Sequence, residues 1–207
     1  EALKLAKLST EAMPDEPTLH TQLISLMIRF NTVHEVPAYI ESILPRFPDH
    51  VEIQQFYCLT LKINNHREKA DELYQSLIKR HRVPASFRII YETYLPRLNS
   101  SAEEIETLRR EFIASAQKFI AEKPPVDLML LSFTPLFPLA FHNRDNKEIL
   151  KLYTRMLRTT CKELNFTAPH CKPGAKRKEG PTRIGYISMH MHGHSVGNCF
   201  RDSMIYL

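Results

Sequence analysis

The spacing of apolar residues along the first 165 positions predicts amphipathic helices. Apolar side chains recur every three or four residues in stripes such as Ala70–Ile78, Ile105–Ile120 and Ile149–Cys161. This spacing gathers them on one face of an α-helix. Ser101 is expected to cap the second of these helices, with Glu104 in the capping-box position three residues later. The sequence therefore predicts a mostly α-helical protein.

A longer regularity indicates internal repeats. The pair Pro14-Asp15 recurs as Pro48-Asp49, and each pair is expected to separate two helices. The interval between them, about 34 residues, is the length of the tetratricopeptide helix–turn–helix unit. Ala70 and Tyr74 fall at the small and aromatic positions of that unit. We interpret residues 1–98 as about two and a half degenerate repeats that stack into a solenoid. Such a stack either binds a peptide or protein on its concave surface or acts as a spacer.

The glycines divide the chain. All five lie at or after Gly174, so the preceding residues must make their turns with proline and asparagine. We expect repeats over residues 1–98, a helical connector with a structural His142 over 99–165, and a basic linker over 166–182. Residues 183–207 are expected to follow a different structural pattern.

Composition excludes several classes of protein. With 43% hydrophobic and 25% charged residues, the chain is typical of a folded globular protein rather than a disordered one. No apolar run reaches the roughly 20 residues of a transmembrane helix, so we expect no membrane partner and a cytoplasmic location. The net charge of +5 comes mainly from residues 171–207. We interpret that cluster as a linker and expect no nucleic-acid partner, because no nucleic-acid-binding motif accompanies it.

The last segment has the pattern of an α/β unit. Residues 183–188 read Arg-Ile-Gly-Tyr-Ile-Ser, a β-branched and aromatic run typical of a strand. A loop rich in histidine and glycine follows, and a helix is expected from Cys199 or Phe200. In open α/β sheets, ligands bind at the carboxyl ends of strands, which is where this loop would lie. Because the chain opens on Glu1 and ends on an apolar stretch, we expect it to be a fragment of a longer protein.

Three histidines in this loop suggest a metal site as an alternative. His190, His192 and His194 alternate along the chain, so in a strand they would share one face. The first carboxylate after them is Asp202, and Gly193 would interrupt the strand before the third imidazole. Zinc sites need three or four ligands with orienting partners. We therefore predict no bound metal, and a metal-dependent hydrolase remains an alternative function.

Residues 183–188 and the His-Ser-Val-Gly sequence at 194–197 resemble the start of the catalytic domain of SPINDLY-like and bacterial-type O-GlcNAc transferases. Residues 138–146 and 168–170 resemble stretches upstream of that domain. The family joins tetratricopeptide repeats to a GT-B glycosyltransferase with two Rossmann-type halves. The resemblance implies an α-solenoid followed by the first βα unit of a truncated Rossmann-type domain. The chain departs from the family at His190-Met191, where an Asp-Phe pair is usual, and it lacks the second half.

The resemblance also implies a reaction and its residues. GlcNAc or a related sugar would pass from a nucleotide sugar, UDP-GlcNAc, to Ser/Thr hydroxyls of a polypeptide held by the repeats. His194 is the implied catalytic residue, since an imidazole can accept a proton or bind sugar or phosphate. Gly193, Ser195, Gly197 and Asn198 are the implied substrate-binding residues, through close backbone approach or hydrogen bonds. No cofactor is expected, and this fragment alone should be inactive; the other alternative is a non-catalytic protein-binding scaffold.

Overall fold

The computed structural model describes residues 1–127, 136–175, 180, 185, 187–188 and 193–205. The chain forms two compact units, Glu1–Phe166 and Thr167–Leu207, which are called unit 1 and unit 2. Helices dominate the described residues, and none of these residues belongs to a strand. The prediction of a mostly helical protein is confirmed.

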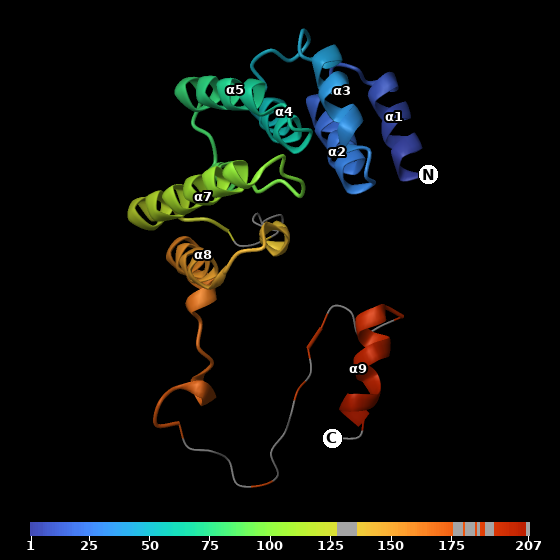
Figure 1. Ribbon diagram of the computed structural model, residues 1–207. Helices are drawn as coiled ribbons and strands as arrows, with labels where there is room; N and C mark the ends of the chain where they lie inside the picture. The colour runs from blue at the N-terminus through green and yellow to red at the C-terminus, as the bar shows by residue number, and fades with distance from the viewer. Residues whose placement is uncertain (128–135, 176–179, 181–184, 186, 189–192, 206–207) are drawn as a thin grey trace. The chain divides into compact units, whose positions relative to one another are not determined.

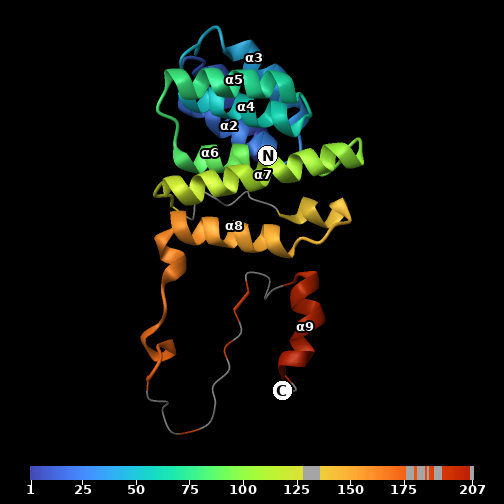
Figure 2. The ribbon, with the colours of Figure 1, turned by 60° about the vertical axis from the view of Figure 1, so that its left-hand side comes forward.

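Unit 1 is a succession of α-helices, and those from α1 to α6 are joined by short turns (Figures 1 and 2). Its α-helices are α1 (Ala2–Ala12), α2 (Pro17–Arg29), α3 (Val36–Ile43), α4 (Val51–Ile63), α5 (Arg67–Arg80), α6 (Ala85–Glu92), α7 (Ala102–Glu122) and α8 (Lys147–Thr160). The 3-10 segments are η1 (Val33–Glu35), η3 (Phe137–His142) and η4 (Lys162–Asn165). Unit 2 contains the 3-10 segment η5 (Pro169–Cys171) and the helix α9 (Ser195–Ile205). None of the helices built from described residues is long and apolar enough to span a bilayer.

The first half of unit 1 repeats with a constant period. Helices α2, α4 and α6 begin at Pro17, Val51 and Ala85, so successive starts are separated by the same interval as the two Pro-Asp pairs. Buried side chains recur with this period. They are Leu23, Ile24, Met27, Val36, Ile40 and Ile43 in one repeat and Tyr57, Cys58, Leu61, Ala70, Tyr74 and Leu77 in the next. All of them belong to one continuous core, as expected when neighbouring repeats bury each other's apolar faces. The architecture is consistent with an α-solenoid.

A polar cluster fixes the start of the first of these repeats. The carbonyl oxygen of Pro14 accepts a hydrogen bond from Arg46 Nη1 at 2.8 Å, and Arg46 Nε lies 3.1 Å from Asp15. The same carbonyl lies 3.0 Å from Nε2 of the buried His20, whose Nδ1 lies 2.6 Å from the Tyr39 hydroxyl. Because a carbonyl can only accept, Nε2 carries a proton and donates to Pro14. His20 is therefore a structural residue that connects Pro14 with Tyr39.

The same cluster recurs one period later with one substitution. The Gln54 side-chain amide donates to the Pro48 carbonyl, and Arg80 lies 3.7 Å from Asp49 and donates to Gln54 Oε1 at 3.3 Å. Gln54 replaces the histidine because an amide, like a neutral imidazole, offers an N–H donor and an acceptor. The Pro-Asp pairs thus mark a repeated set of contacts as well as a repeated length.

Helices α2 and α4 also end in the same way. Asn31 and Asn65 adopt left-handed φ angles of 65° and 64°. In both cases the N–H of the following residue donates to the carbonyl five residues earlier, at 2.9 Å, as in a Schellman motif. Glycine is the usual residue at this position, and asparagine is one of the few others that tolerates it. These asparagines explain how the repeats make tight turns without glycine.

Replacing Asn65 by alanine should lower the free energy of unfolding by about 1 kcal/mol, because an ordinary Cβ is strained in the left-handed region. Replacing it by glycine should leave stability unchanged or raise it, since glycine adopts that conformation freely. Urea unfolding followed by circular dichroism measures both changes, with the exposed Glu68→Ala as a control for ordinary surface substitution. Equal stability of the alanine and glycine variants would show that backbone conformation is not the determinant.

Helix α7 begins where the sequence predicts. The Ser101 hydroxyl accepts from the Glu104 N–H at 3.1 Å. The carboxylate of Glu104 accepts from the backbone and hydroxyl of Ser100, one residue before the position that a standard capping box uses. The first turn of α7 is therefore capped on both sides.

Helices α7 and α8 run parallel to each other. Arg109 on α7 donates to the Asp145 carbonyl at 2.7 Å and to Asn146 Oδ1 at 2.6 Å, at the start of α8. Val126, just after α7, donates to the carbonyl of Thr160 at the end of α8, at 3.0 Å. The first half of α7 is therefore joined to the start of α8, and the residues that follow α7 are joined to the end of α8. This arrangement distinguishes them from a hairpin, in which consecutive helices are antiparallel.

The predicted βα unit is not found among the described residues of unit 2. Within residues 183–188, only Gly185, Ile187 and Ser188 are described, and they lie in irregular backbone. A strand requires a hydrogen-bonded neighbour, and the described part of the chain supplies none. Most of the basic cluster, residues 176–179 and 181–184, lies outside the described residues as well.

Candidate functional site

The residues implied by the resemblance meet at the start of α9. The helix begins at Ser195, so the expected start at Cys199 or Phe200 is wrong by one turn. The reason is a backbone hydrogen bond of 2.9 Å from the Asn198 N–H to the His194 carbonyl, which closes the first helical turn. His194 is therefore the residue immediately before the helix.

This position has a defined electrostatic character. By helix geometry, the N–H groups of residues 195–197 precede the first intrahelical donor and point out of the helix end. Together with the helix dipole they favour an anionic group, such as a phosphate or carboxylate. His194, which is partly exposed, can add a proton donor or acceptor beside them.

The two predicted glycines differ in their surroundings. Gly197 is the third residue of α9 and is buried, so it does not lie in a loop as expected. Gly193 is exposed, and a Cβ added to it would meet no atom within 4 Å. Ser195 and Asn198 lie in the same first turn, both exposed. The structure thus brings the five predicted residues together, with only Gly193 and His194 outside the helix.

The metal hypothesis involved three histidines, and the structure describes only His194 among them. His190 and His192 lie outside the described residues. Within the residues that are described, no group of three or more histidine, cysteine or acidic side chains is arranged to hold a metal ion.

Unit 1 contains a buried histidine, His142, at the end of η3. It is 1% exposed, and neither ring nitrogen has a hydrogen-bond partner among the described residues. Burial lowers its pKa, and the positive charges of Arg109 and Arg144 act in the same direction against Glu106. His142 is therefore neutral at neutral pH. In the sequence, the burial of His142 was indicated by the apolar residues 136–141 that directly precede it.

Unit 1 also has two open grooves that the sequence did not predict. The first, of about 440 Å³, lies where α3, α4 and α5 meet. Its two charged lining residues, Glu41 and Arg80, already have partners. Glu41 accepts from the Tyr57 hydroxyl and from Lys69 Nζ at 2.7 Å, and Arg80 lies 3.7 Å from Asp49. The hydrogen bond from Lys69 lowers the pKa of Glu41. The charged groups of this groove therefore contribute to the fold and are not free to bind a ligand.

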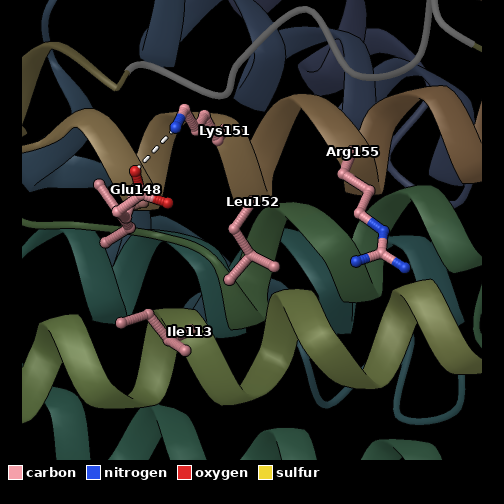
Figure 3. Close-up of a pocket in the computed structure, with 6 residues that line it drawn as sticks. Ile113, Glu148, Lys151, Leu152 and Arg155 are labelled. Atoms are coloured by element: carbon pink, nitrogen blue, oxygen red, sulfur yellow. Dashed lines mark hydrogen bonds and ion pairs between the residues drawn. The ribbon is translucent and has the colours of Figure 1, made fainter.

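The second groove, of about 330 Å³, lies between α7 and α8 (Figure 3). Leu152 of α8 points toward Ile113 of α7 and forms an apolar centre. Glu148 and Lys151 form an ion pair of 2.8 Å at one end, and Arg155 lies at the other. This groove combines apolar surface with a cation that no side chain of the described residues neutralises.

Comparison of the chain with protein-family models, with curated protein sequences and with solved structures gives no match. The first half of unit 1 belongs to the class of repeated helix stacks and is consistent with an α-solenoid.

Proposed function

We propose that the chain is part of a protein glycosyltransferase of the O-GlcNAc transferase type. It would transfer GlcNAc or a related sugar from UDP-GlcNAc to Ser/Thr hydroxyls of a polypeptide. The observation that carries the proposal is the gathering of His194, Ser195, Gly197 and Asn198 at one helical turn. These are the residues that the resemblance implies for the site. The constant period of the helices in unit 1 supports the tetratricopeptide part of the same resemblance.

The proposed chemistry follows from the start of α9. The donor diphosphate gains negative charge as the sugar leaves, and outward N–H groups at a helix N-terminus can offset that charge. The His194 imidazole can accept the proton of the attacking hydroxyl or donate a hydrogen bond to phosphate. Under this proposal, unit 2 is the beginning of the first Rossmann-type half of the catalytic domain. The second half would supply most donor contacts and would lie outside these 207 residues.

The proposal is tested on the full-length protein with radiolabelled UDP-GlcNAc and a mixture of unstructured Ser/Thr-containing polypeptides. We expect label to enter polypeptide. Under this proposal the second Rossmann-type half supplies most donor contacts, so we expect no transfer by the 207-residue chain alone. A full-length reading frame without a second Rossmann-type half, or a complete protein that neither transfers nor hydrolyses UDP-GlcNAc, would refute the proposal. In that case the stacked helices favour the second candidate, a non-catalytic scaffold that binds proteins through its repeats.

A further inference from the structure

The α7–α8 groove has the features of a peptide-docking surface. Helix α8 packs on α7 with one face, through buried residues such as Ile149, Tyr153 and Met156. Leu152 and Ile113 lie at the edge of this interface and stay partly exposed in the groove. An apolar strip of this kind gains free energy when a second apolar surface covers it.

The charged side chains that line the strip leave one net positive charge. They are Glu148, Lys151 and Arg155, all on α8. Glu148 is already neutralised by Lys151 at 2.8 Å. The residues Glu148, Lys151, Leu152 and Arg155 follow the i, i+3, i+4, i+7 spacing, so they share one face of the helix. The groove is therefore an apolar strip whose lining holds one unpaired cation, Arg155.

Arg155 is the residue that determines the choice of partner. Elsewhere in unit 1, arginines such as Arg46 and Arg88 pair with a carboxylate, and others such as Arg29 have none among the described residues. Arg155 differs from these because it lines the groove. The exposed guanidinium of Arg155 has no such carboxylate among the described residues. A guanidinium binds a carboxylate through two parallel hydrogen bonds, which gives direction as well as attraction.

We infer that the α7–α8 groove binds an acidic amphipathic segment of a partner polypeptide. An apolar side chain of that segment covers Leu152 and Ile113, while a neighbouring Asp or Glu pairs with Arg155. This is the groove-binding mode of an amphipathic helix, with one apolar anchor and one charged anchor. The inference does not depend on the proposed transferase activity, because it uses only residues of unit 1.

The test uses the whole 207-residue chain and fluorescein-labelled peptides, with affinity measured by fluorescence polarisation. One peptide repeats Glu-Glu-Leu-Leu, a second repeats Lys-Lys-Leu-Leu, and a third repeats Glu-Glu-Ser-Ser. We expect binding of the first alone, weakened by added salt, because exposed charge pairs are screened. Binding of the lysine peptide with equal affinity, or no binding of the first peptide, would overturn the inference.

Charge reversal at Arg155 locates the site. Arg155→Glu should weaken binding of the Glu-Leu peptide by about tenfold or more and should permit binding of the Lys-Leu peptide. Arg29→Glu makes the same charge change at an exposed position on α2 and should leave both affinities unchanged. Leu152→Asp should also abolish binding, and if that variant fails to fold, the Arg155 result decides alone. Equal effects of the Arg155 and Arg29 variants would overturn the groove as the site.

Discussion

Replacing His194 by alanine is expected to reduce sugar transfer by the full-length protein about a hundredfold or more. The imidazole is the only titratable side chain among the five residues gathered at the start of α9. The substitution removes the ring but retains the backbone carbonyl that accepts the Asn198 N–H. The first turn of α9 should therefore stay formed while the proposed proton acceptor is lost. Steady-state kinetics with UDP-GlcNAc measures the loss of sugar transfer, and a thermal unfolding curve tests whether the fold is retained.

The matched control is His34→Ala in η1. His34 has an exposed side chain, 69% accessible, and contacts its neighbour Glu35. This variant should transfer sugar at the unchanged rate. Unchanged turnover of the His194 variant would refute its assignment, and an equal loss in both variants would refute a specific role for His194.

We expect the second large effect from replacing Glu92, the last residue of α6, which should lower the stability of the fold. Its carboxylate, only 12% exposed, accepts from the Tyr74 hydroxyl at 2.5 Å and from Lys118 Nζ at 2.8 Å. Glu92 thus ties α6 to α5 on one side and to α7 on the other. Burial and the nearby carboxylate raise the pKa of Tyr74, so the phenol remains a donor at neutral pH. Glu92→Ala should lower the free energy of unfolding by about 2 to 3 kcal/mol, because it leaves this buried donor unpaired.

Glu122→Ala is the control for this prediction. Glu122 binds Arg88 at 3.0 Å and is 40% exposed, so solvent screens the pair. Its loss should cost less than about 1 kcal/mol. Urea unfolding of both variants separates the two effects, and equal destabilisation would show that the Glu92 contacts do not join the helices.

The regular part of the fold could be predicted because its determinants are local. The apolar stripe at Ala70–Ile78 lies on α5, and Ser101 caps α7, since both depend on neighbours within a few residues. The period of the repeats could also be predicted, because the distance between the two Pro-Asp pairs is visible in the sequence itself. The polar cluster at each repeat was not predictable, because Arg46 lies far along the chain from the Pro14 carbonyl that it binds.

The start of α9, in contrast, was predicted incorrectly from the sequence. Gly193 and Gly197 suggested a loop up to Asn198, because glycine lowers helix propensity. One bond between His194 and Asn198 nevertheless places Gly197 inside the helix. Propensity is a weak determinant, of about 1 kcal/mol for a glycine, and a hydrogen bond with the surrounding turn can override it.

By itself, the sequence determined that this chain is mostly helical and that its first half repeats with the period of the Pro-Asp pairs, because both are carried by spacing along the chain. Only the tertiary structure decided that α7 and α8 run parallel, with the α7–α8 groove between them, and that Glu92 joins three helices. Those features depend on which distant residues meet, and burial of shared apolar surface determines that pairing.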